Sequence, residues 1–526
     1  MRTQGHDPLR DDEPVWCRAG WVDPAAYLNG WWRLQRDAFE RLLAVRDVHD
    51  LGLAGWELAL LGPWSHVVQA ALARFEHALR DAPAAGRGGA RVLALTALAR
   101  DLWMESLIAR GSHATGSDAA LCRSRFHAEQ RIGRRVLQAS RQLGGGLVKA
   151  AQFASTRPDL LSPSITTQLS AVHDQLPAHP WSVTEATLIH ELGCPVSAVF
   201  AEIDPEPVAS ASIAQVHRGR LVDGRAVAIK VQHPGLEQLV DADLAAFESL
   251  VCVFERLEPS LQLRPILDYL RWSLPREIDF LREAESATAL AAVLAHRHDV
   301  MVPAVHDALT TPRLLVTDWI DGIKITDLAG LQRAGVDHAQ LATTLIEVYA
   351  EQLLWSAWCH ADPHPGNLLV RPEADGPVLV LLDHGLTFRL PEALREQLRD
   401  ASAAMADGDP WALIDVLGRL GIAIDTDVDT NLLVWLSEVL LGKGAGARMR
   451  AALDEDDTAD TTEVADGNAG LSRRLGGMIG GVSSEVFAVG RCMGMVDGIS
   501  RQLAPGIDAM QVFERLRLAR NADTVS

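Results

Sequence analysis

One short segment, His360-Ala361-Asp362-Pro363-His364-Pro365-Gly366-Asn367, constrains this chain more than any other part of its 526 residues. Asp362 precedes Asn367 by five residues, and two apolar stretches around Ala374-Asp375-Gly376 then lead to Asp383-His384-Gly385. Each piece alone fits an ordinary turn, because Asp, Asn, Pro and Gly are the residues that turns favour. The combination, with a predicted strand pair between the two halves, is much harder to obtain by chance.

This order and spacing of Asp, Asn and Asp-x-Gly are typical of kinase-type phosphoryl transfer. Such chemistry uses a hard divalent cation, which prefers oxygen ligands, so we predict that Asn367 and Asp383 hold Mg²⁺. Asp362 would orient or deprotonate the attacking hydroxyl. His360 and His364 flank it, but Pro363 and Pro365 argue against a helical zinc motif, and we expect a structural, hydrogen-bonded His360.

A second set of candidate residues lies upstream. Lys230 ends the apolar stretch Val227-Ala228-Ile229-Lys230, where a kinase fold places the lysine that binds the phosphates, although a strand-end lysine can also be merely solvated. Glu277, Asp279 and Glu283 are expected on one predicted helix. Glu283 is the predicted partner of Lys230, and a solvated acidic face is the alternative for the three acids.

The loop from Ala209 to His217 occupies the place where protein kinases have glycines over the phosphates. Ala209, Ala211 and Ser212 are therefore predicted nucleotide-binding residues. Because alanine carries a Cβ, this loop should approach the phosphates differently from a glycine loop.

The coarse pattern predicts an α+β fold. Helical periodicity runs over 120–200, 236–296 and about 337–358; three antiparallel strands are expected over 199–231, with a turn at 222–225, and a strand pair near 302–318. Only Leu-Thr-Phe-Arg-Leu separates Asp383-His384-Gly385 from Pro391 and a further helix. This leaves no room for the long activation segment on which protein kinases dock peptides, so protein phosphorylation is not expected.

Composition excludes several classes of protein. Forty-nine Lys and Arg against 69 Asp and Glu give a net charge of -20, which makes nucleic acid a poor partner. Six scattered cysteines form no C-x-x-C pair, so neither a disulfide framework nor a zinc site is expected. The first residues of the chain are polar and acidic, and the sequence contains no run of about 18 apolar residues. We predict a cytoplasmic protein without a transmembrane helix, with peripheral membrane contact as an option.

Two segments stand apart from the rest. Residues 1–118 contain seven of the 14 tryptophans at helical spacing and predict a helical extension, whose aromatics would be core or an anchor for an unidentified partner. Residues 454–466 are acidic and poor in apolar residues, which predicts a disordered insert.

These motifs together resemble the UbiB/AarF family of atypical protein-kinase-like proteins, over residues 130–400 and, through a helical continuation, to 510. The resemblance rests on the motifs above and on further residues, namely Lys149-Ala150-Ala151-Gln152, Ser155, Arg157, Asp159, Pro163, Gln215-Val216-His217 and Asp321-Gly322-Ile323-Lys324. Two departures are visible: Ala151 stands where the family has Gly, and His384 replaces the usual Phe.

The resemblance implies a two-lobed, helix-rich kinase-like domain over 119–510, with an N-lobe over 135–320, a C-lobe over 320–510 and a tail over 511–526. It implies that Asp318 to Ile320 form the hinge that holds adenine. It also implies that Lys149 and Gln152 lie over the active site with Glu277 and Asp279 and exclude protein substrates.

The function implied is ATP and Mg²⁺ binding with ATP hydrolysis or phosphate transfer to a small molecule or isoprenoid lipid, in support of quinone metabolism. A nucleotide-gated binding module with negligible catalysis is the alternative, which the departures at Ala151 and His384 favour slightly. A scaffold that binds no nucleotide is a third option.

Overall fold

The computed structural model describes residues 95, 98, 99 and 102 and the ranges 118–155, 163–170, 178–257, 263–407, 409–422 and 482–525. Nearly all of the predicted tryptophan-rich extension (1–118) and the whole predicted acidic insert (454–466) lie outside these residues, as do Arg157 and Asp159.

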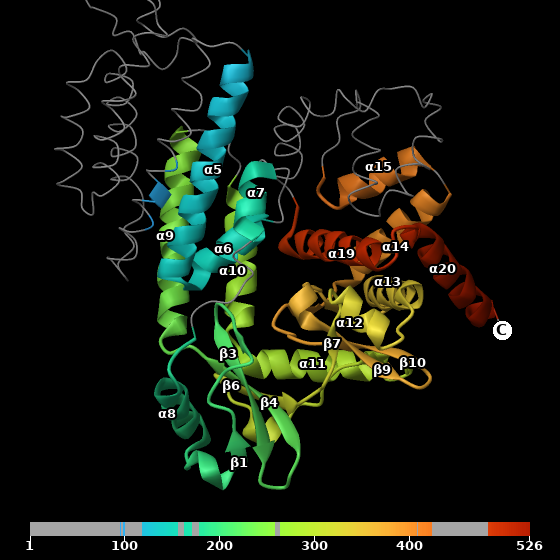
Figure 1. Ribbon diagram of the computed structural model, residues 1–526. Helices are drawn as coiled ribbons and strands as arrows, with labels where there is room; N and C mark the ends of the chain where they lie inside the picture. Colours follow the sequence, from blue (N-terminus) through green and yellow to red (C-terminus); the bar gives the residue numbers. More distant parts are fainter. Residues whose placement is uncertain are drawn as a thin grey trace, which may run out of the picture. The chain divides into compact units, whose positions relative to one another are not determined.

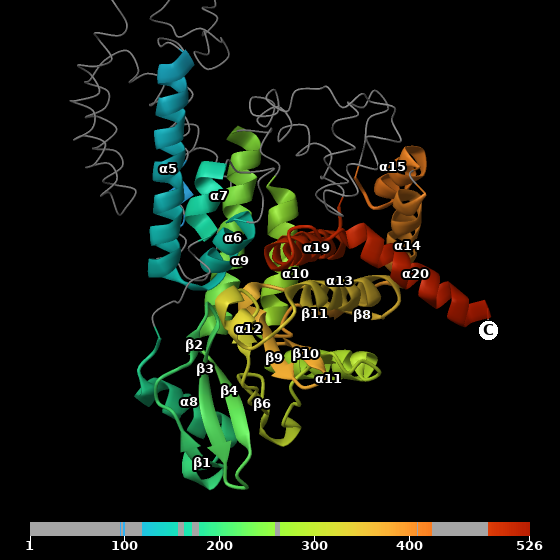
Figure 2. The same ribbon diagram turned by 45° about the vertical axis from the view of Figure 1, so that its right-hand side comes forward.

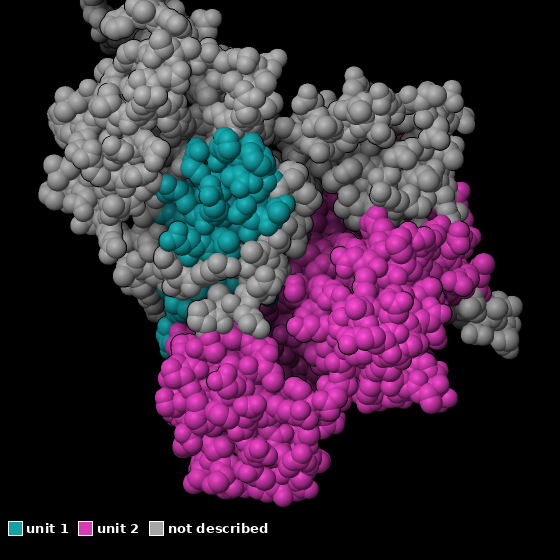
Figure 3. All heavy atoms as spheres, viewed as in Figure 1, with its two compact units in different colours: residues 1–174, 237–267 teal, residues 175–236, 268–526 magenta. Residues whose placement is uncertain are grey.

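The chain forms two compact units, and neither is continuous in sequence (Figure 3). The first combines residues 1–174 with 237–267, and the second combines 175–236 with 268–526. The predicted site residues therefore divide between them: Lys149 and Gln152 belong to the first unit, and the other predicted catalytic, nucleotide-binding and metal-binding residues to the second.

The described part of the first unit is helical (Figure 1). Its helices are α5 (Asp118–Leu143), α6 (Gly145–Ser155), α7 (Pro163–Ser170) and α9 (Leu236–Leu257). Gly144, with a φ of 62°, separates α5 from α6. Gly146 then allows close packing, since its N–H donates to Asp243 Oδ2 at 2.7 Å and a Cβ there would lie 2.9 Å from that oxygen.

The second unit begins with a small sheet covered by helix α8 (Trp181–Leu192). The strands follow the order β1-β3-β4-β6, with β2 paired to β3. Their bounds are β1 Phe200–Ile203, β2 Ala209–Ser210, β3 Ala214–Leu221, β4 Ala226–Gln232 and β6 Leu314–Asp318. The core between sheet and helix consists of apolar residues at alternate strand positions, among them Val227, Ile229 and Val231 of β4 and Leu188 of α8. Because Lys230 lies between two of these core positions, its side chain projects from the opposite face of the sheet.

The predicted tight turn joins β3 to β4. Asp223 Oδ1 accepts a hydrogen bond from Arg225 N at 3.0 Å, and Gly224 supplies a φ of 94°. The turn fixes the register Val216↔Lys230. The position of Lys230 on the sheet is thus set by local turn chemistry.

The rest of the second unit is a mainly helical lobe around a second sheet (Figures 1 and 2). Its strands are β5 Val300–Met301, β7 Ile323–Lys324, β9 Leu368–Glu373 and β10 Gly376–Leu381 in the order β5-β10-β9-β7, with a separate pair β8 Trp358–His360 and β11 Thr387–Arg389. Its described helices are α10 Arg264–Glu277, which belongs to this unit from Asp268 on, α11 Phe280–Leu294, α12 Leu328–Arg333, α13 His338–Leu354, α14 Glu392–Ala406, α15 Pro410–Arg419, α19 Ser484–Leu503 and α20 Ala509–Val525. The described residues of the second unit also form three short 3₁₀ turns, η3 Val196–Ala198 and η4 Asp307–Leu309 beside the small sheet and η5 Pro365–Asn367 in the helical lobe. Helix α13 is buried along most of its length and packs against α19 in one apolar cluster.

The two-lobed, kinase-like α+β fold is confirmed, with local differences from the predictions. The strand pair expected near 302–318 is reduced to β6 and isolated bridges such as Val305↔Thr317. The helix expected to reach 358 ends at Leu354, because Trp358 to His360 pair with β11 instead. Residues 509–525, most of the predicted tail, form α20. No described helix is long and apolar enough to cross a bilayer.

Candidate active site

Three predicted residues meet where the small sheet faces the helical lobe. Lys230 Nζ lies 2.8 Å and 2.9 Å from the two carboxylate oxygens of Glu283 on α11, and 3.0 Å from Asp383 Oδ2. The ring of Phe280, one turn before Glu283, lies 5.1 Å from the ammonium group. Lys230 is 13% exposed and Glu283 2%, whereas Asp383 is 43% exposed. The ammonium group therefore binds the buried carboxylate of Glu283 on one side and the solvent-accessible carboxylate of Asp383 on the other.

Burial and charge act against each other in this cluster. Burial alone would lower the pKa of Lys230, but the carboxylates of Asp383 and Glu283 raise it above its ordinary value, so the lysine is a fixed cation. Burial raises the pKa of Glu283 to about 7, although the Lys230 ammonium opposes this rise. A permanent cation beside an accessible carboxylate is suited to an anionic ligand such as a phosphate.

Asp383 has an unusual backbone. Its φ of 55° is the one positive value among the described residues other than glycine. His360 supports this conformation, since its Nε2 lies 2.9 Å from Leu382 O and 3.0 Å from Asp383 O, while Tyr349 Oη lies 2.7 Å from its Nδ1. The two carbonyls require Nε2 to carry the proton, and Nδ1 then accepts from the tyrosine hydroxyl. The predicted structural, hydrogen-bonded His360 is confirmed.

His384, which stands where the family has Phe, is buried, and both of its ring nitrogens have hydrogen-bond partners. Its ring nitrogens lie 3.2 Å from Thr387 Oγ1 and 3.2 Å from Leu381 O. Burial lowers the pKa of His384 to about 3, so the ring is neutral. Its backbone N–H donates to Glu283 Oε1 at 3.3 Å, which joins the Asp383 segment to α11.

The Asp362–Asn367 segment forms a tight loop that is tied to Asp383. Asn367 Nδ2 donates to Asp362 O at 3.1 Å, and the Asn367 carbonyl accepts from Leu382 N at 2.8 Å. With Nδ2 used in this bond, Oδ1 is the Asn367 atom suited to a cation. The amide oxygen of Asn367 and the accessible carboxylate of Asp383 are hard donors that fit Mg²⁺. Among the described residues, no group of three or more His, Cys, Asp or Glu side chains could hold a metal.

Arg491 is a residue of this site that the sequence analysis did not identify. It lies on α19 and is 8% exposed, and its Nη2 donates to Asp362 Oδ1 at 3.0 Å and to Ala361 O at 3.3 Å. Arg491 follows Asp362 by 129 residues, outside every motif considered above. No local pattern in the sequence could have identified it.

The alanine-rich loop is a tight turn between β2 and β3. Ala209 is in β2, Ala211 N donates to Ala214 O at 2.8 Å, and Ser212 is buried. His233 holds the turn, because its backbone N–H donates to Ile213 O and its Nε2 lies 3.0 Å from Ala211 O. The loop is thus anchored to the end of the strand that carries Lys230.

The predicted hinge begins at Asp318, the last residue of β6. The N–H groups of Asp318 and Trp319 donate to Ala304 O and Ala226 O. These bonds do not use the Asp318 carbonyl or the Ile320 N–H, the backbone groups suited to an adenine edge. The Asp318 side chain points elsewhere, to His306 Nε2 at 2.9 Å.

The expectation that Glu277, Asp279 and Glu283 share one helix is wrong. Glu277 ends α10, and Asp279 is the N-cap of α11, where its side chain accepts from Arg282 N at 3.2 Å. Glu277 is buried beside the Asp383 segment, since a Cβ at Gly385 would lie 3.4 Å from Asp383 Oδ1 and 3.5 Å from the Glu277 Cα. Lys149 and Gln152 lie on α6 in the first unit, and their place over the nucleotide stays a prediction.

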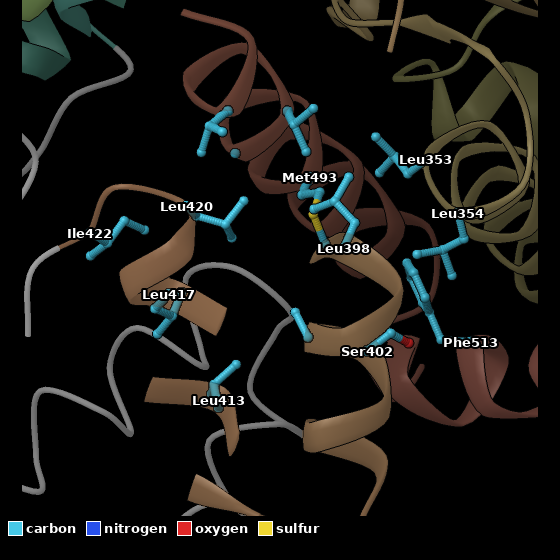
Figure 4. Close-up of a pocket in the computed structure, with 14 residues that line it drawn as sticks. Leu353, Leu354, Leu398, Ser402, Leu413, Leu417, Leu420, Ile422, Met493 and Phe513 are labelled. Atoms are coloured by element: carbon cyan, nitrogen blue, oxygen red, sulfur yellow. The ribbon is translucent and has the colours of Figure 1, made fainter. Parts of the chain in front are cut away.

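A separate apolar hollow lies in the helical lobe (Figure 4). It has a cavity volume of about 60 Å³ and is lined from α13, α14, α15, α19 and α20 by residues such as Leu398, Leu417 and Met493. None of the lining residues belongs to the site described above.

Part of the chain matches a known domain family. Residues 171–417, just under half of the chain, match the model of the ABC1 atypical kinase-like domain. This match includes Lys230, Glu283, Asp362, Asn367 and Asp383, and ends before α19.

Proteins of the UbiB/AarF family are among those to which the chain is similar. The chain is 34% identical over 253 residues to AarF domain-containing protein kinase 1 of Xenopus tropicalis, a match that covers 48% of each protein. It is 33% identical over 303 residues to the probable protein kinase UbiB of Aeromonas salmonicida, with 56% of each covered. The chain thus spans about half the length of these relatives. A solved complex of Rv3197 from Mycobacterium tuberculosis with erythromycin is 22% identical, with a TM-score of 0.43 over 69% of this chain and 93% of the other.

Proposed function

We propose that this protein binds ATP with Mg²⁺ and hydrolyses it, or transfers its terminal phosphate to a small-molecule or isoprenoid-lipid acceptor. The observation that carries the proposal is the Lys230–Glu283–Asp383 cluster beside the Asp362–Asn367 loop. The fixed cation of Lys230 and two hard oxygen donors, the Asp383 carboxylate and the Asn367 amide, are what phosphoryl transfer requires.

The residues take distinct roles in this proposal. Lys230 binds phosphate oxygens, and Glu283 keeps the ammonium in place. Asn367 and Asp383 would hold Mg²⁺, which supplies neutralisation of charge on the phosphates. Asp362 orients the attacking hydroxyl or water. The loop at Ala209, Ala211 and Ser212 covers the nucleotide, and the backbone at Asp318 and Ile320 holds adenine.

The acceptor is proposed to be small or lipidic because of the short segment after Asp383. It runs directly through β11 into α14 at Glu392, so no extended peptide-docking segment is present there. A lipid acceptor suits a cytoplasmic protein that works at a membrane surface. A role in isoprenoid-quinone metabolism is part of the same proposal and follows from the family.

ATP turnover by purified protein tests the proposal. Asp383→Asn should lower kcat by about 100-fold or more, as loss of one electrostatic group commonly does. The control is Asp415→Asn on α15, because Asp415 is 74% exposed and its carboxylate pairs with Arg419 on the surface. Turnover by Asp383→Asn at the parent's rate would contradict the proposal. Tight ATP binding without turnover in the parent would instead favour the nucleotide-gated module.

A further inference from the structure

Helix α19 contacts three consecutive residues of the Asp362 loop. Arg491 Nη2 lies 3.0 Å from Asp362 Oδ1 and 3.3 Å from Ala361 O, and the next residue, Cys492, places its thiol 3.6 Å from His360 O. The start of the loop is therefore held by one turn of a helix that lies outside the matched ABC1 domain.

The ion pair in this contact is shielded from solvent. Arg491 is 8% exposed and Asp362 17%. A shielded ion pair loses hydration, so its presence is weak evidence that it stabilises the fold. A buried arginine beside a predicted reactive carboxylate therefore suggests a role in the reaction. Burial would lower the pKa of Arg491, but the carboxylates of Asp362 and Glu277 raise it, so the guanidinium is a permanent cation here.

The support of Arg491 is rigid. Cys492, Val496 and Ile499 of α19 share one apolar cluster with Leu345 and Tyr349 of α13, and Tyr349 in turn bonds to His360 of the same loop. Helix and loop thus rest on one packed core. A planar guanidinium on such a support can fix both a carboxylate oxygen and a backbone carbonyl.

We propose that Arg491 is a positioning residue for phosphoryl transfer, acting through Asp362. By holding Oδ1, Arg491 stops the carboxylate from rotating and presents it to the acceptor in one orientation. The inference rests on the proposed function. It predicts an effect on the chemical step and none on nucleotide affinity, because Lys230 and Asp383 bind on their own elements.

Three variants on α19 test this inference. Arg491→Met should lower kcat for ATP about 100-fold, the scale expected for a small misplacement, with KM for ATP and the Mg-ATP thermal shift unchanged. Arg491→Lys should recover part of the loss, because lysine keeps the positive charge but lacks the planar guanidinium that can bind two oxygens at once. Arg501→Met is the matched control: Arg501 is on the same helix, paired with Asp497 and 36% exposed, and its loss should change nothing.

Two further measurements separate positioning from mere support of the fold. Hydrogen exchange of the peptide 358–370 should quicken in Arg491→Met and not in Arg501→Met. In an Asp362→Asn background, Arg491→Met should cost no further kcat, because the residue acts through Asp362. This double variant also carries no unpaired Asp362 charge, so it serves if the single variant fails to fold.

The outcomes distinguish the two claims. A parent without turnover overturns the proposed function and this inference with it. A parent that turns over ATP, together with Arg491→Met at the same kcat or an equal further loss in the Asp362→Asn background, overturns the inference alone.

Discussion

At the scale of single residues, the charged forms of Lys230 and Glu283 stabilise each other in a buried place. Glu283 is 2% exposed and makes two short bonds to the lysine. Lys230→Met should therefore destabilise the protein by up to about 3–5 kcal/mol well above pH 7, the usual cost of leaving one member of a buried pair alone, and by less at lower pH, where Glu283 takes up a proton. Adding Glu283→Gln should recover most of the loss, because a neutral amide still accepts from His384 N. Urea unfolding of the three proteins checks this, and a fully stable single variant would contradict it.

His384 makes the stability depend on pH. Its pKa is lowered to about 3 by burial, below the value of about 6.5 expected in the unfolded chain. The unfolded state therefore takes up this proton first, and stability should fall as the pH drops from about 6.5 towards 3. The expected slope is at most about 1.4 kcal/mol per pH unit from this group. His384→Phe should reduce the slope in unfolding experiments without Mg²⁺, and an unchanged slope would show that His384 is not its source.

At the scale of elements, α11 is a separate helix from α10, and Asp279 stabilises its N-terminus. Its side chain caps α11, the helix that carries Glu283. Asp279→Ala should cost about 1 kcal/mol, whereas Asp279→Asn, which also caps well, should cost little. Thermal unfolding distinguishes the two variants.

The same pair of variants tests the second role of Asp279. The family resemblance places its carboxylate near the nucleotide, so Asp279→Asn should weaken Mg-ATP binding although the cap is kept. If Asp279→Asn binds Mg-ATP as the parent does, the residue is only a cap.

The local motifs were predictable because each is built from a few neighbouring residues. The turn at Asp223-Gly224 and the strands around Asp375 follow from turn chemistry and from alternating or continuous apolar patterns. The split of Glu277 from Glu283 was not foreseen, since the helical spacing of the surrounding residues continues across Ile278. There the capping geometry of Asp279 overrides the periodicity.

At the scale of the whole molecule, segments that are distant in the sequence belong to the same compact unit. Residues 237–267 join the first compact unit, although they lie between β4 and α11 of the second. Arg491 reaches Asp362 across 129 residues. Such long-range partners leave no periodicity or spacing in a single sequence, which is why the core of the site was predictable and its support from α19 was not.

The central claim is that the Lys230–Asp383 cluster binds Mg-ATP, and thermal unfolding with and without ligand tests it most directly. At about a hundredfold excess over Kd, Mg-ATP should stabilise the parent by about 2.7 kcal/mol. The account predicts that this stabilisation requires Mg²⁺ and disappears in Asp383→Ala. Equal stabilisation of the parent and Asp383→Ala, or no stabilisation of the parent, would contradict it.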